Sequence, residues 1–209
     1  MEHQAGDAAE RRFLFLGGHV ALDFVNTVMV ENGEVVDRLT SPGDLAAWVA
    51  VSDLGPRYGT PDTIGPAVYA QAIGLRGALK AGLDALVVGE PVPDATVATL
   101  NAILRNAPGS QLRRSGPEGL RHVLRVDLAA DAGPLPWLLA DAAATLLAGE
   151  DAGRLRRCAN CDTCVLMFLD TSRSHTRRWC SMELCGNRSK VAAHHARRRL
   201  RDGGLAAPS

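Results

Sequence analysis

Apolar residues recur every three or four positions through most of the chain between residues 41 and 149. This period places them on one face of a helix, which can be buried against a neighbouring element. Ser41-Pro42 is a typical helix start, because serine can cap the first turn and proline fits its first position. The pattern predicts helices that begin near Ser41, Pro61, Asp94 and Pro136.

Shorter stretches have the composition of strands. The segment from Val20 to Val30 follows Gly17-Gly18 and is rich in apolar and β-branched residues, which indicates strand or mixed structure. Asn32-Gly33 is a turn signal that predicts a hairpin around it. A second hairpin is expected from segments 111–114 and 120–128. The predicted fold class is therefore mainly α with small β-hairpins (α+β).

Composition narrows the class of protein. The chain has 209 residues, and none of its apolar runs is long enough to span a membrane. Residues 1–12 are polar, carry both charges, and are expected to be disordered; they do not resemble a signal peptide. We therefore expect a cytoplasmic protein without a membrane partner, in which clustered thiols bind metal more often than they form disulfides.

The formal net charge of zero hides an uneven distribution. Residues 154–201 contain 12 arginines and lysines but three acids, so the rest of the chain carries an equal excess of negative charge. The abundance of arginine over lysine is typical of GC-rich coding, which does not explain why the charges gather at one end. The asymmetry indicates an acidic body with a segment that binds nucleic acid.

All five cysteines lie in the last quarter of the chain, within 28 residues. Cys164, Cys180 and Cys185 are spaced C-x15-C-x4-C, and a local partner precedes them at Cys158 or at Cys161. Two short cysteine pairs separated by a hairpin-length spacer predict one tetrahedral zinc ion bound by thiolates. The x2 spacing favours Cys161, whereas Cys158 would require a looser loop.

The order of elements around these cysteines predicts a treble-clef-like zinc finger. Residues 165–169 form a short strand, 170–172 a turn and 177–179 a returning strand, after which a helix follows the last cysteine. So small a module cannot fold on its apolar core alone, and the metal supplies folding energy. Four thiolates close a structural site and leave no position for a catalytic water.

The expected C-terminal helix starts at Asn187, a suitable N-cap, and ends at Gly203-Gly204. Its basic stripe joins arginines of the hairpin in one patch that could contact phosphates. The patch consists of Arg173, Arg177, Arg178, Lys190, His194, Arg197, Arg198 and Arg201. The alternative is a solvated amphipathic helix docked on the body.

Residues 154–203 closely resemble the CGNR zinc finger, whose name is spelled here by Cys185-Gly186-Asn187-Arg188. The segment from Gly17 to Thr27 is similar to the opening of the ABATE domain, which usually precedes this finger. The resemblance implies an ABATE-like, helix-rich body over residues 13–153. The family is described as bacterial stress-induced transcription regulators, which implies DNA binding by the finger, Arg188 included, and a sensing role for the body.

The resemblance also implies a ligand set, in which Cys158 takes the first position and Cys164, Cys180 and Cys185 the others. The first spacing is one residue longer than the usual x4, and Cys161 is extra. The choice between Cys158 and Cys161 is therefore open, with Cys158 favoured because Arg157-Cys158-Ala159 matches the family's lead-in.

The motif around Asp23 and Asn26 suggests a ligand-binding site, with Arg76 as a charge partner. The structural interpretation is stronger, because buried polar side chains of this kind usually bond backbone groups at turns and caps.

These observations favour a zinc-containing DNA-binding transcription regulator that senses a small-molecule effector. The alternative is a finger that docks on the transcription machinery, such as RNA polymerase, or on RNA. No nucleophile, phosphate loop or open metal site indicates an enzyme. Self-association is compatible with either interpretation.

Overall fold

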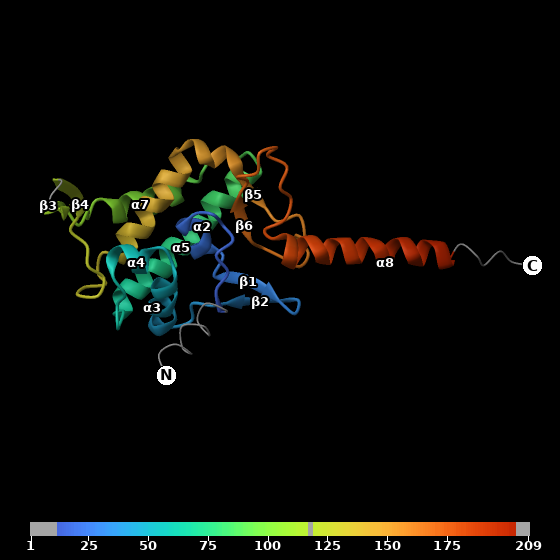
Figure 1. Ribbon diagram of the computed structural model, residues 1–209, viewed down its shortest axis with the longest axis horizontal. Coiled ribbons are helices and arrows are strands. Elements are labelled where there is room, and N and C mark those ends of the chain that lie inside the picture. The colour runs from blue at the N-terminus through green and yellow to red at the C-terminus, as the bar shows by residue number, and fades with distance from the viewer. Residues whose placement is uncertain (1–11, 117–118, 204–209) are drawn as a thin grey trace, which may run out of the picture.

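The computed structural model describes residues 12–116 and 119–203, with the side chains of 196 and 199–203 excepted. A bundle of helices forms the body, and a last helix extends away from it (Figure 1). The body helices are α2 (Val20–Val25), α3 (Pro42–Val51), α4 (Leu54–Tyr58), α5 (Pro66–Val87), α6 (Asp94–Leu104) and α7 (Leu135–Ala148). A 3-10 turn, η2 (Glu150–Arg154), follows α7.

Three antiparallel hairpins complete the body and begin the C-terminal module. They pair β1 (Val28–Glu31) with β2 (Glu34–Asp37), β3 (Ser110–Arg114) with β4 (Leu120–Leu124), and β5 (Leu155–Arg157) with β6 (Met167–Leu169). A π-turn, η3 (Met182–Gly186), runs directly into α8 (Asn187–Gly203). This arrangement confirms the predicted class, mainly α with small hairpins.

Two predicted elements of the body differ from the structure. Residues 20–25 are helical, capped by His19, whose Nδ1 accepts a hydrogen bond from the amide of Ala21 at 3.2 Å. Most side chains of α2 are buried, and Asp23 is its one polar residue, so the short segment lacks the polar face that would distinguish it from a strand. The long helix α5 begins at Pro66 rather than Pro61, because Pro66 occupies its first turn.

The hydrophobic core of the body surrounds α5, which packs against α2, α6 and α7. Its largest fully buried side chains include Trp48 and Phe24, whose ring centroids lie 5.3 Å apart. Among the described residues, no helix has the length and apolar character needed to cross a membrane.

The hairpin β5–β6 belongs to the same core, although it lies in the cysteine-rich segment. Leu155, Met167 and Leu169 are buried within the main hydrophobic cluster of the body. Asn26 holds β6 from the other side: its Nδ2 donates to the carbonyl of Met167 at 2.8 Å, and its Oδ1 accepts from the amide of Met167 at 2.9 Å. The cysteine-rich module is therefore anchored in the body.

Candidate metal centre and nucleic-acid interface

Four cysteines from separate turns of the module meet in one buried group. Cys158 follows β5, Cys164 precedes β6, Cys180 lies in the loop before η3, and Cys185 lies within η3. All four Sγ atoms lie within 4.8 Å of one another. The Cys164–Cys180 pair is separated by 3.8 Å and the Cys180–Cys185 pair by 3.6 Å.

These separations are those of thiolates around a zinc ion. Zn–S bonds of about 2.3 Å in a tetrahedron place neighbouring sulfur atoms about 3.8 Å apart, whereas a disulfide requires about 2.0 Å. All the cysteines are free thiols. The group therefore fits one structural Zn²⁺, as the spacing of the cysteines predicts.

The four thiols lie so close together that their ionised forms would repel one another without a bound cation. Hydrogen bonds among these groups lower the pKa of Cys158, while the bonds with Cys158 and Cys164 raise the pKa of Cys180 well above its usual range. The bond to Cys158 likewise raises the pKa of Cys164 to about 12. Four adjacent thiols cannot all ionise without a counter-charge, and Zn²⁺ supplies it.

The structure places Cys158, and not Cys161, with the other three cysteines. The Cys158 amide donates to the Leu166 carbonyl at 3.0 Å, one step beyond the last residue pair of β5–β6, and this contact turns its side chain inward. Cys161 is exposed at the tip of the loop, where its Sγ lies 3.9 Å from a carboxylate oxygen of Asp162. The longer first spacing is thus accommodated by the loop.

A buried carboxylate organises the loop that leads to Cys180. Asp170 is fully buried and accepts from the Ser172 hydroxyl at 2.5 Å and from the Arg177 amide at 3.0 Å. The Ser172 hydroxyl is the main cause of the lowered pKa of Asp170. The sequence indicated only a turn at this position; the aspartate followed two residues later by serine is the signal for such a capped turn.

The predicted returning strand at 177–179 is absent, because Arg177 bonds the loop carbonyls instead. Its guanidinium lies over the ring of Phe168, 4.3 Å from the centroid, and donates to the carbonyls of Trp179 and Cys180. Arg177 is half-buried in these contacts. These contacts give Arg177 a structural role, and its role in nucleic-acid binding stays a prediction.

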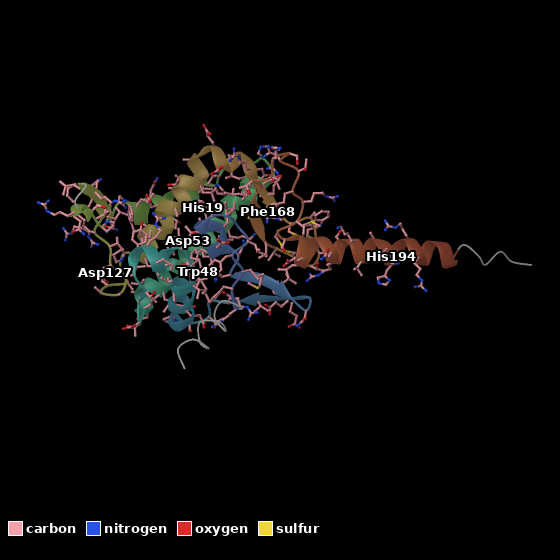
Figure 2. The ribbon with its side chains drawn as sticks, viewed as in Figure 1. His19, Trp48, Asp53, Asp127, Phe168 and His194 are labelled. Atoms are coloured by element: carbon pink, nitrogen blue, oxygen red, sulfur yellow. The ribbon has the colours of Figure 1, made fainter. Side chains whose placement is uncertain are left out.

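The other predicted nucleic-acid residues lie on the surface. The exposed set is Arg173, Arg178, Arg188, Lys190, His194, Arg197 and Arg198. Arg201 belongs to the part of α8 whose side chains lie outside the described residues. Helix α8 projects from the body, with His194 along its length (Figures 1 and 2). Residues 191–195 are all exposed, so this part of the helix is not docked on the body.

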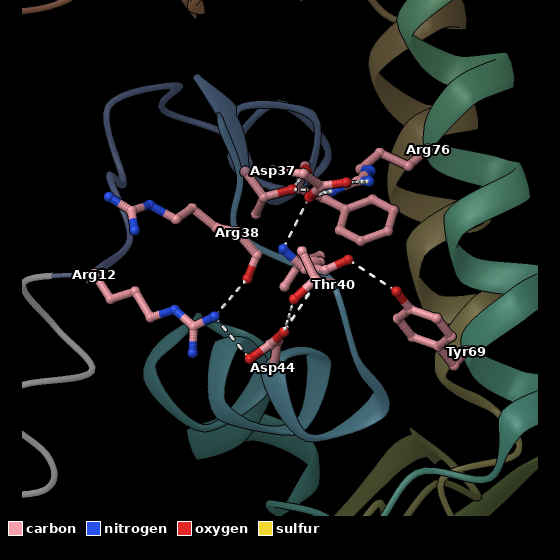
Figure 3. A network of polar contacts seen from close by, with 10 residues as sticks. Arg12, Asp37, Arg38, Thr40, Asp44, Tyr69 and Arg76 are labelled. Atoms are coloured by element: carbon pink, nitrogen blue, oxygen red, sulfur yellow. Dashed lines mark hydrogen bonds and ion pairs between the residues drawn. The ribbon is translucent and has the colours of Figure 1, made fainter. Parts of the chain in front are cut away.

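The three residues of the predicted ligand site do not converge. Asn26 bonds the backbone of Met167, as described above. Arg76 forms a bidentate ion pair with Asp37, at 2.8 and 2.5 Å, and also donates to the Thr27 hydroxyl. Both side chains are thus used structurally, and the Asp37–Arg76 pair continues into the network of Figure 3.

The same network orders Arg12, the last residue of the segment predicted to be disordered. Arg12 donates to a carboxylate oxygen of Asp44 at 2.7 Å and to the carbonyl of Arg38 at 3.1 Å (Figure 3). Residues 1–11 of that predicted segment lie outside the described residues.

Asp23, the third residue of the predicted site, lines a cavity. Its Oδ1 accepts from the Gly17 amide at 2.8 Å, while burial, opposed by this bond, raises its pKa to about 6. The cavity has a volume of about 400 Å³ and is also lined by Phe15, His19 and Asp53. Burial lowers the pKa of His19.

Comparison with known families accounts for nearly all of the chain. A family described as "Putative stress-induced transcription regulator", ABATE, matches residues 18–150, which is more than half of the sequence. The CGNR zinc finger matches residues 154–198, which include the four-cysteine group. No curated protein matches the sequence. The chain therefore belongs to the ABATE family and ends in a CGNR zinc finger.

Proposed function

We propose that the protein is a DNA-binding transcription regulator whose finger and helix α8 contact the phosphate backbone of duplex DNA. The observation that carries the proposal is the projecting basic helix. It has 17 residues, and its side chains from Val191 to His195 are exposed. A polar helix without a packed face is only marginally stable alone, so a partner that covers it is expected.

The charge of the exposed side chains supports a polyanion as the partner. Arg173 and Arg178 lie in the loop between β6 and η3, and Lys190 and Arg197 lie in α8; all four side chains are exposed. Among the described residues, none of these four forms an ion pair with an acid. A helix of this length, about 25 Å, fits the major groove of DNA.

The test compares two variants that each lose two positive charges. Lys190→Gln/Arg197→Gln removes them from α8, while Arg57→Gln/Lys80→Gln removes them from the body. Binding to duplex DNA is measured by fluorescence anisotropy over a range of salt concentrations. We expect the α8 variant to reduce the log–log salt slope by about 2, because each phosphate contact contributes about 0.9. The body variant keeps the wild-type slope, and both variants keep their zinc.

The alternative, docking on the transcription machinery, makes the opposite prediction. Binding of the wild-type protein to DNA would be absent or insensitive to salt, and immobilised protein would retain RNA polymerase. If the partner is RNA and not DNA, the protein should bind single-stranded RNA more tightly than duplex DNA. Either result would overturn the DNA-binding proposal.

We also propose that the protein acts by binding rather than catalysis, and that the body senses a small molecule. Four thiolates would occupy all four positions of a tetrahedral zinc ion, which leaves none for a reactive water.

The cavity beside Asp23 has the volume of a small-molecule site, which supports the proposed sensing role of the body. A small molecule that binds in this cavity should raise the melting temperature of the protein by mass action. If the Asp23 carboxylate contacts that molecule, Asp23→Ala should abolish the increase.

A further inference from the structure

The β3–β4 hairpin forms a second basic surface, at the end of the molecule opposite to α8 (Figure 1). Its outer part, residues 112–114 and 119–122, is exposed on both strands. Side chains tipped with nitrogen extend from it into solvent (Figure 2). The hairpin is therefore an open two-stranded ribbon.

The charge of this ribbon contrasts with the acidic balance of the rest of the body. Residues 105–126 contain five arginines and a single acid, Glu118, whose placement lies outside the described residues. The arginines are Arg105, Arg113, Arg114, Arg121 and Arg125, and all are exposed. Within the described residues, none of them forms an ion pair.

The strand register concentrates the charge further. Arg113 lies directly opposite Arg121, so both side chains project from the same face of the ribbon. Like charges in this arrangement destabilise a hairpin. A polyanion that lies across this face would relieve the repulsion between the two arginines. The unfavourable pair is therefore consistent with a site for a polyanion.

The shape of the ribbon fits a groove of nucleic acid. Two-stranded ribbons enter the major groove of B-DNA, where arginines reach phosphates and base edges. On the other face of the ribbon, Leu112 and Leu120 are exposed by 65 and 60%.

We infer that the β3–β4 hairpin is a second duplex-DNA-binding surface, in which Arg113 and Arg121 contact phosphates. This inference rests on the proposed function of α8 and extends it. Because the two surfaces lie at opposite ends, the protein contacts either a long stretch of one duplex or two separate duplex segments.

The test uses Arg113→Gln/Arg121→Gln in the full-length, zinc-loaded protein, with Arg57→Gln/Lys80→Gln as the control of equal charge. On a duplex of about three turns, the ribbon variant should lose about 2 from the log–log salt slope, whereas the control keeps it. Arg113→Lys/Arg121→Lys should restore most of the slope. The melting temperature of the ribbon variant should not fall, because a repulsive pair has been removed.

Stoichiometry then separates the two geometries. With a duplex of about one turn, binding of two duplexes per protein, reduced to one by the ribbon variant, shows two independent segments. One duplex per protein, with an effect of the ribbon variant only on the longer DNA, shows a single continuous contact.

Three outcomes overturn the inference. If the α8 variant weakens binding and the ribbon variant does not, the ribbon proposal fails while the proposed function stands. If the wild-type protein binds no duplex DNA, both fail. If the ribbon variant loses affinity only for vesicles of anionic lipid, the hairpin contacts a membrane instead.

Discussion

The interiors of the body and of the finger differ in composition. The body packs large side chains such as Trp48, Phe24 and Leu75 around α5. The finger has a small separate cluster in which the four cysteines are joined by few apolar residues, chiefly Met29, Leu166 and Phe168. An apolar core stabilises the first region by burial, whereas the second region depends on a metal.

The two regions are separate along the sequence, but each contributes side chains to the hydrophobic cluster of the other. Met29, in the finger cluster, comes from β1 of the body, while Leu155, Met167 and Leu169 of the finger lie in the core of the body. Zinc therefore stabilises one end of a structure whose core both regions share. Loss of the metal should therefore also weaken the body.

The largest expected effect comes from removing zinc. Cys164→Ser, or a chelator, should unfold the finger, because structural zinc contributes roughly 10 kcal/mol or more. Loss of burial at Leu155, Met167 and Leu169 should also cost the body about 5 kcal/mol, lowering its melting temperature by about 10–20 °C. Circular dichroism with metal analysis measures both.

Cys161→Ser is the control for that experiment. Its thiol is exposed and lies outside the four-cysteine group, so this variant should keep one zinc per chain and the wild-type melting temperature. An unchanged melting temperature of the body after chelation would show that the two regions are independent.

The next effect tests the junction itself. Asn26→Ala removes both hydrogen bonds to Met167 and leaves a buried amide and carbonyl of β6 unpaired. We expect a loss of about 2–5 kcal/mol in the free energy of unfolding, measured by urea denaturation. Zinc release, followed with a colorimetric chelator, should become faster because the finger is anchored less firmly.

The matched control is Asn101→Ala on the exposed face of α6, which should change neither quantity appreciably. If Asn26→Ala destabilises the body but leaves zinc release at the wild-type rate, the junction does not couple the two regions.

The smallest effect concerns pH. Burial raises the pKa of Asp23 to about 6 from its ordinary value of 3.8, so the folded protein binds this proton more tightly than the unfolded chain. Stability should therefore fall as pH rises between these two values and then level off. Asp23→Asn keeps an oxygen that can accept from Gly17 but cannot ionise, so this variant should exceed the stability of wild type by about 3 kcal/mol above pH 6.

The measurement compares the melting temperatures of Asp23→Asn and wild type from pH 4 to 8. The difference between the two proteins should shrink toward pH 4, where Asp23 of the folded protein is protonated. Asp53→Asn serves as a control, since Asp53 is exposed and makes only a minor contribution to the raised pKa of Asp23. A difference between Asp23→Asn and wild type that does not vary with pH would mean that Asp23 is ionised throughout.

Local patterns in the sequence predicted the features that depend on neighbours along the chain. Helical spacing identified α3, α6 and α7, the Asn32-Gly33 turn identified the β1–β2 hairpin, and the cysteine spacing indicated zinc. Each of these signals spans a few residues or one short loop, so the physical cause is present in the sequence itself. Helix α2 was missed because its burial removes the polar face that reveals a helical period.

Contacts between distant residues were decided only by the tertiary structure. Asn26 and Met167 are 141 positions apart, and nothing in either local sequence indicates that one amide side chain pairs with that strand. The selection of Cys158 over Cys161, and of a structural role for Arg177, likewise depended on how loops close around the cysteines. A sequence states which groups must find partners, while the folded chain determines which partners come within reach.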